Sequence, residues 1–143
     1  MTVQNKNIVL VMGRPNTGKS SSLRNLPQSS MAYLNCDLKE TPFRNRFAAN
    51  IEVADANDVL AYIADIEAEP AISGGVLDTI TFLMQMYERQ YVAPLAGTKQ
   101  GQSAWGDYGN FYRSFVHAIK SGTKDYAILA HEHTEYNEEK LRN

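Results

Sequence analysis

Residues 8–20 restrict the fold more than any other stretch, because they read as a strand, a glycine-containing turn and the start of a helix. Residues 8–12 are all apolar, as in a strand buried on both faces. Gly13 and Gly18, followed by a Lys-Ser pair, fit the pattern G-x-x-x-x-G-K-[ST]. Residues 21–26 can continue as a short helix. This predicted context is the one in which the pattern forms a phosphate-binding loop.

Such a loop concentrates hydrogen-bond donors around a triphosphate. Its backbone N–H groups turn inward, and the following helix presents the positive end of its dipole. We expect Lys19 to contact the β- and γ-phosphates and the Ser20 hydroxyl to bind Mg²⁺. The alternative is an ordinary glycine-rich turn ahead of a helix. The predicted nucleotide-binding residues are Gly13, Arg14, Pro15, Asn16, Thr17, Gly18, Lys19, Ser20 and Ser21.

Length and composition indicate one nucleotide-binding domain over residues 1–143. The net charge of −2 gives no overall basic field that would attract nucleic acid, although local basic loops are compatible with it. Cys36 is the single cysteine, which excludes an internal disulfide and fits a reducing cytosol. No signal peptide and no apolar run of membrane-spanning length occur in the sequence. We therefore expect a cytoplasmic protein without membrane contact.

Apolar runs alternate with helical periodicities along the chain, which predicts an α/β fold with a parallel sheet and helices on both faces. The helix expected over residues 55–69 starts with Asp55 as its N-cap and has its apolar side chains on one face. Two glycines weaken the strand expected over residues 70–78. Strands are predicted at residues 7–12, 31–35, 51–53, 70–78 and 126–130, and helices at residues 18–25, 55–69, 79–91 and 105–121.

The helix expected over residues 105–121 carries aromatic side chains at helical spacing. Aromatic rings can stack on nucleic-acid bases, but this spacing is typical of a core-facing surface, so we expect these rings in the core. They belong to Trp105, Tyr108, Phe111, Tyr112 and Phe115. The preceding loop, residues 94–103, is polar, and its segment 99–103 is the better candidate for a contact with DNA or another subunit.

Polar residues follow the predicted strands at the edge where parallel sheets bind ligands. Asp37 comes after the second strand, Asp78 ends the strand at residues 70–78, and His131 follows the last strand. We expect Asp78 to hold Mg²⁺ together with Ser20. The alternative for Asp78 is structural, with its side chain capping the helix that starts at Thr79.

Four short motifs resemble those of RecA-like P-loop ATPases, and in particular the small phage-encoded ATPases of recombination and single-strand annealing. They are GRPNTGKS, YLNCD after the second strand, VLDTIT around the metal acid, and ILAHEH at the last strand. The resemblance implies a catalytic acid at Asp37, with Glu40 as the alternative, and a γ-phosphate sensor at His131. The predicted catalytic residues are therefore Lys19, Asp37 and His131.

The chain also departs from this family pattern. The acid after the second strand, usually Glu, is Asp37 here, and Thr79 rather than a water-activating Glu follows Asp78. The family continues with at least one further strand, so we expect residues 1–143 to be a C-terminally incomplete domain.

These features predict an ATP- and Mg²⁺-dependent ATPase that acts on single-stranded DNA in phage recombination or repair, assembled as a homo-oligomer. A nucleotide or small-molecule kinase is the alternative enzyme. Kinases of this fold carry an arginine-rich lid, whereas residues 93–104 contain no Arg and one Lys. A GTPase is disfavoured because the sequence lacks the guanine-reading N-K-x-D motif. A nucleotide-binding module without hydrolysis also remains open.

Overall fold

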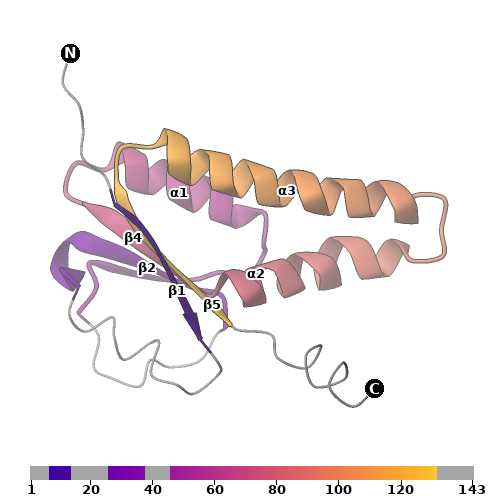
Figure 1. The fold of residues 1–143 in the computed structure, drawn as a ribbon, viewed down its shortest axis with the longest axis horizontal. Coiled ribbons are helices and arrows are strands. Elements are labelled where there is room, and N and C mark those ends of the chain that lie inside the picture. The colour runs from indigo at the N-terminus through magenta and orange to yellow at the C-terminus, as the bar shows by residue number, and fades with distance from the viewer. Residues whose placement is uncertain (1–6, 14–25, 38–45, 132–143) are drawn as a thin grey trace, which may run out of the picture.

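The computed structural model describes residues 7–13, 26–37 and 46–131, which form a parallel β-sheet and a layer of helices (Figure 1). The predictions for residues 1–6, 14–25, 38–45 and 132–143 lie outside these described residues. The five strands follow the order β1-β5-β4-β2-β3, and every neighbouring pair is parallel. The expected α/β fold with a parallel sheet is therefore confirmed.

The predicted strands are present, and all but the strand at residues 31–35 have shifted ends. They are β1 (Ile8–Gly13), β2 (Met31–Asn35), β3 (Ala49–Glu52), β4 (Gly74–Asp78) and β5 (Asp125–His131). The strand expected over residues 70–78 begins only at Gly74. The residues before it form a turn, in which the N–H of Ile72 donates to the carbonyl oxygen of Glu69 at 3.1 Å.

The two glycines of β4 have a packing reason. A Cβ atom on Gly74 would stand 1.9 Å from the carbonyl oxygen of Asp125 in β5. A Cβ atom on Gly75 would stand 3.1 Å from Ile66 and 3.2 Å from the Tyr126 ring. These glycines therefore permit a close approach of neighbouring elements, which outweighs their low strand propensity.

The helices α1 (Asp58–Ala68), α2 (Ile80–Tyr87) and α3 (Gly101–Ser121) lie on one face of the sheet (Figure 1). Their apolar side chains form one core with alternate residues of β2, β4 and β5. The helix predicted over residues 18–25 lies outside the described residues, so the three described α-helices all occupy this face. None of them is long and apolar enough to cross a lipid bilayer. The opposite face carries a smaller apolar cluster of Met31, Tyr33, Phe47, Val76, Ala127 and Leu129.

The prediction that Asp55 is the N-cap of α1 is wrong. Helix α1 begins at Asp58, and Asn57 occupies its N-cap position without a side-chain cap bond. The Asp55 carboxylate instead accepts hydrogen bonds from the Asn57 N–H at 3.0 Å and from the Tyr91 hydroxyl at 2.5 Å. Asp55 therefore builds the turn before α1 and ties that turn to the end of the following helical segment.

Helices α2 and α3 form a hairpin that extends past the sheet (Figure 1). The helix predicted over residues 79–91 is α-helical to Tyr87 and continues as a π-helical turn, Glu88–Val92, and a 3₁₀ turn, Ala93–Leu95. Helix α3 starts at Gly101 rather than Trp105, so the connecting loop is shorter than predicted. The sequence does not signal this earlier start, because glycine is a poor helix former and Gln100 supplies no side-chain cap.

The aromatic residues of α3 divide between the core and the surface, which corrects the prediction that all of them face the core. Phe111 and Phe115 are buried, and the Phe111 ring stacks on Tyr87 with 4.5 Å between centroids. Trp105 and Tyr112, however, are 52% and 48% exposed. These two residues are seven positions apart and lie on one flank of the helix, because the core-facing stripe is narrower than the aromatic set.

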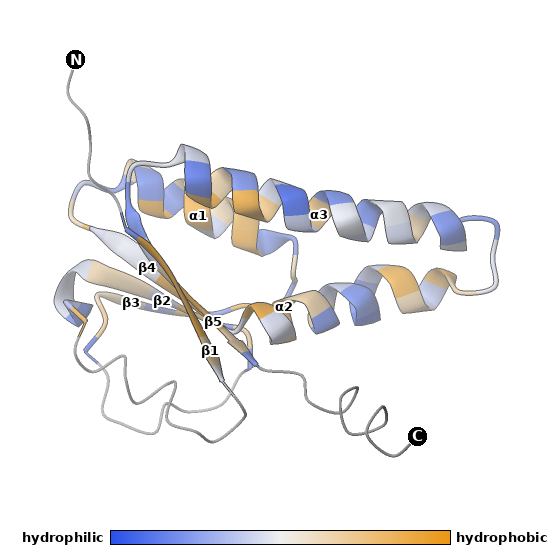
Figure 2. Ribbon diagram, viewed as in Figure 1, coloured by the Kyte–Doolittle hydropathy of each residue, from blue (hydrophilic) through white to orange (hydrophobic). Residues whose placement is uncertain are grey.

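Strand β1 lies at the end of the strand order, and the expectation that it is buried on both faces is wrong. The ribbon of β1 carries the colour of hydrophobic residues in Figure 2, although the strand has only β5 as a neighbour in the strand order. Leu10 and Met12 are 58% and 61% exposed. The apolar run therefore identified the strand correctly, but not its position at the sheet edge within the described part of the chain.

Candidate functional site

The strands all run in the same direction, so their carboxyl ends meet along one edge of the sheet (Figure 1). Gly13 at the end of β1 lies beside His131 at the end of β5. Asp78 at the end of β4 pairs with Asn35 at the end of β2, and Asp37 follows two residues later. Four predicted site residues from separate stretches of sequence thus stand at one edge.

Asp78 is a buried carboxylate, 8% exposed. The Tyr33 hydroxyl donates a hydrogen bond to its Oδ2 atom, and its carbonyl oxygen accepts one from the Cys36 N–H at 2.8 Å. The N-cap of α2 is Thr79, whose Oγ1 accepts a hydrogen bond from the Phe82 N–H at 3.1 Å. The capping role considered for Asp78 therefore belongs to Thr79.

Tyr33 is a further residue of the candidate site, which no sequence motif indicates. It pairs with Val76, which lies two residues before Asp78 on the same side of β4, so the phenol reaches Asp78 by lying along the sheet. Phe47 stacks on the Tyr33 ring with 4.9 Å between centroids. Burial raises the pKa of Tyr33, and the hydrogen bond to Asp78 raises it further. The phenol therefore keeps its proton and remains a donor.

Asp37 lies half-buried just beyond β2. The turn there uses Asn35, whose Oδ1 accepts a hydrogen bond from the Asp37 N–H at 3.0 Å. Burial raises the pKa of the neighbouring Cys36 thiol to about 12, and the charges of Asp78 and Asp37 contribute to this rise. The two carboxylates thus lie within electrostatic reach of the same thiol. Cys36 stays neutral near pH 7, so it is not a thiolate nucleophile.

His131 connects the end of β5 to the start of α2. Its backbone N–H donates to Thr81 Oγ1 at 2.9 Å, and its imidazole packs edge-on against Phe82 with 4.7 Å between ring centroids. Because β5 lies between β1 and β4, His131 stands between the strand of the predicted phosphate loop and the strand of Asp78. Its role as a γ-phosphate sensor stays a prediction.

A protein-family model described as an AAA domain matches residues 5–143, nearly the whole chain. The chain belongs to this AAA domain family. It is accordingly a P-loop NTPase, and family membership implies that it binds a nucleotide such as ATP. No match is found among the curated proteins.

The AAA domain typically binds its nucleotide with Mg²⁺. No group of three or more His, Cys, Asp or Glu side chains that could hold a metal occurs in residues 7–13, 26–37 and 46–131. Mg²⁺ commonly takes one or two carboxylates and completes its shell with water and substrate phosphates. Asp78 supplies a carboxylate of this kind at the carboxyl edge of the sheet.

Most of the predicted phosphate loop of this AAA domain lies outside the described residues. The structure places Gly13, the last residue of β1, but not the residues from Arg14 to Ser21. Glu40, the alternative catalytic acid, also lies outside them. The roles of Lys19 and Ser20 therefore remain predictions from the sequence.

Proposed function

We propose that this AAA-domain protein is a Mg²⁺-dependent ATPase of the RecA-like type that acts on single-stranded DNA in phage recombination or repair. The observation that carries the proposal is the order of the strand ends. From β1, which leads into the predicted phosphate loop, the edge presents His131, then Asp78, then Asp37. This order supports a site in which sensor, metal ligand and catalytic acid follow one another beside the phosphates.

Each residue has one task in the proposed reaction. Lys19 binds the β- and γ-phosphates, Ser20 and Asp78 hold Mg²⁺, and His131 contacts the γ-phosphate. Asp37 orients a water molecule and accepts its proton while the water oxygen bonds to the γ-phosphorus and the bond to the β–γ bridging oxygen breaks. When bound, Mg²⁺ would neutralise part of the phosphate charge. The products are ADP and inorganic phosphate.

The α2–α3 hairpin supports an action on DNA. Its loop, residues 96–100, contains Lys99, and the nearby Trp105 is 52% exposed. Base stacking on exposed aromatic rings, combined with basic contacts to phosphates, binds single strands without sequence preference. We therefore include Trp105 with the predicted contact segment 99–103.

The decisive experiment is ATP turnover measured with and without a single-stranded oligonucleotide. We expect turnover to rise with the oligonucleotide and the fluorescence of Trp105, the chain's single tryptophan, to be quenched on binding. If neither turnover nor fluorescence responds, the DNA part of the proposal is refuted. ATP binding without turnover indicates a non-hydrolysing module, and turnover that requires a phosphate acceptor indicates a kinase.

Lys19→Ala is the control for the site itself. Lys19 is expected to donate to the ligand rather than to pack in the core, so the variant should lose ATP binding and keep the wild-type melting temperature. Wild-type affinity for ATP in this variant would refute the predicted phosphate loop.

A further inference from the structure

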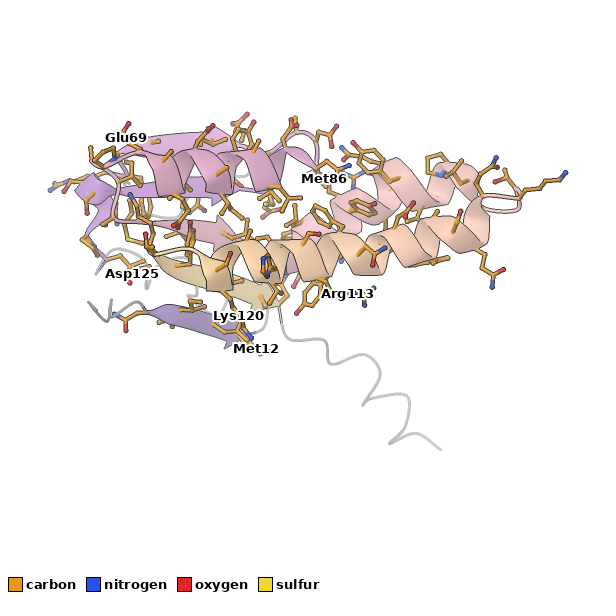
Figure 3. All side chains as sticks on the ribbon, turned by 90° about the horizontal axis from the view of Figure 1, so that it is seen from above. Met12, Glu69, Met86, Arg113, Lys120 and Asp125 are labelled. Atoms are coloured by element: carbon orange, nitrogen blue, oxygen red, sulfur yellow. The ribbon has the colours of Figure 1, made fainter. Side chains whose placement is uncertain are left out.

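Two buried tyrosines each donate a hydrogen bond to a carboxylate, at opposite ends of the sheet. Tyr33 donates to Asp78 at the carboxyl edge, and Tyr126 donates to Glu67 Oε2 at 2.7 Å near the amino ends of the strands. Figure 3 shows Asp125, the neighbour of Tyr126, at the far end of the strand layer from Met12. The same chemical pair thus occurs once beside the candidate site and once away from it.

The pair at the amino end joins structural elements. Glu67 of α1 also accepts hydrogen bonds from the N–H and the hydroxyl of Thr123, at 2.6 and 3.3 Å. These contacts attach the end of α1 to the start of β5. Tyr126 therefore has a structural role and no connection to the candidate site.

The pair at the carboxyl edge has a different setting. The Tyr33 ring lies against the sheet, covered by the ring of Phe47. The segment around Phe47 is itself anchored, because the Arg46 N–H donates to Gln28 Oε1 at 2.6 Å and the Ala48 N–H donates to the Met31 carbonyl oxygen at 2.9 Å. The phenol is therefore held in one place, and its hydroxyl is aimed at the predicted Mg²⁺ ligand.

We propose that Tyr33 is a positioning residue, whose hydroxyl holds the Asp78 carboxylate in the orientation that binds the Mg²⁺ of a Mg²⁺–nucleotide complex. This inference rests on the function proposed above for the same site. A carboxylate has about four lone-pair sites, so accepting a hydrogen bond from Tyr33 is compatible with binding a hydrated cation through the same group. Carboxylates that ligate metals are commonly oriented by such outer hydrogen bonds, and loss of the outer partner weakens metal affinity.

The test compares Tyr33→Phe with Tyr126→Phe, because each variant removes one buried hydroxyl and keeps the ring. ATP binding is titrated by calorimetry over a range of Mg²⁺ concentrations and in EDTA, and the melting temperature is measured without nucleotide. In Tyr33→Phe, the Mg²⁺ concentration for half-maximal ATP binding should rise roughly 10- to 100-fold, with little change in EDTA. In Tyr126→Phe, neither binding measurement should change, although both variants should melt at lower temperature.

The outcomes separate this inference from the proposed function. Wild-type Mg²⁺ dependence in Tyr33→Phe, or equal losses in Mg²⁺ and in EDTA, overturns the positioning role and leaves the proposed function standing. Absence of Mg²⁺-dependent ATP binding in the wild-type protein overturns both. If Tyr33→Phe does not fold, Phe47→Leu replaces it, since this change loosens the ring and keeps the hydroxyl. Phe47→Leu should raise the Mg²⁺ concentration for half-maximal ATP binding, but by a smaller factor than Tyr33→Phe. An unchanged Mg²⁺ concentration overturns the proposal.

Discussion

Replacing Gly74 by Ala measures how closely β4 approaches β5. The new Cβ atom would stand 1.9 Å from the Asp125 carbonyl oxygen, and real Cβ atoms essentially never come closer than 3.0 Å to such an atom. The obstacle is backbone and cannot rotate aside as a side chain would. The start of β4 must therefore move away from β5 by about 1 Å. This is a large displacement for two hydrogen-bonded strands, whose spacing is about 4.8 Å.

The loss in free energy of unfolding caused by Gly74→Ala can be estimated from the contacts around Gly74. Forcing an additional carbon into a close-packed site costs about 1–3 kcal/mol. The same shift strains the hydrogen bond from the Asp125 N–H to the Ser73 carbonyl oxygen, 3.2 Å long, and loss of such a bond costs about 0.5–1.5 kcal/mol. We expect the free energy of unfolding to fall by about 2–4 kcal/mol and the melting temperature to fall by about 5–15 °C.

Gly106→Ala is the matched control, because a Cβ atom there would meet nothing within 4 Å and the residue lies inside α3. This variant should gain about 0.5–1 kcal/mol, since Ala is the better helix former. Thermal unfolding followed by circular dichroism compares both variants with the wild-type protein. A Gly74→Ala melting temperature within about 2 °C of wild type would refute the close approach of the two strands.

Three further predictions concern the candidate site. Asp78→Asn should weaken ATP binding more in Mg²⁺ than in EDTA, and equal losses in a calorimetric titration would point to a structural role for this residue. Asp37→Asn should bind ATP normally and hydrolyse it roughly 100-fold more slowly or worse; unchanged steady-state turnover would remove Asp37 from the mechanism and favour Glu40. Burial raises the pKa of Cys36 from 9.0 to about 12, so the native thiol should resist iodoacetamide at pH 8. Because the folded-state pKa is the higher one, the stability linked to this thiol is complete below about pH 9 and is lost as the pH rises toward 12. Rapid alkylation of the native protein would show that the thiol is accessible.

The parts of the fold that depend on local pattern were predictable from the sequence. A short apolar run predicts a strand at any position in the sheet, and the strand predicted at residues 31–35 has the same ends as β2. The positions of Asp37, Asp78 and His131 at one edge also followed, because in a parallel sheet every strand ends on the same side.

Features that depend on neighbours in space were not predictable in this way. Periodicity alone could not show that the core-facing stripe of α3 includes Phe111 and excludes Tyr112. The contact from Tyr33 to Asp78 arises from the register between β2 and β4, and no local motif encodes that register. The exposure of β1 likewise follows from its place in the strand order rather than from its composition.

The position of β1 also sets how its amide hydrogens exchange with solvent. Along a strand, the amide groups of successive residues point to opposite sides. The Asn7 carbonyl oxygen accepts a hydrogen bond from the Tyr126 N–H at 2.9 Å. The backbone N–H and C=O groups of every second residue counted from Asn7, such as Val9, therefore point toward β5. The N–H groups of Leu10 and Met12 then point away from β5. Exchange along the strand that leads into the predicted phosphate loop should therefore alternate with a two-residue period, and a partner that closes this edge would slow exchange at Leu10 and Met12 first.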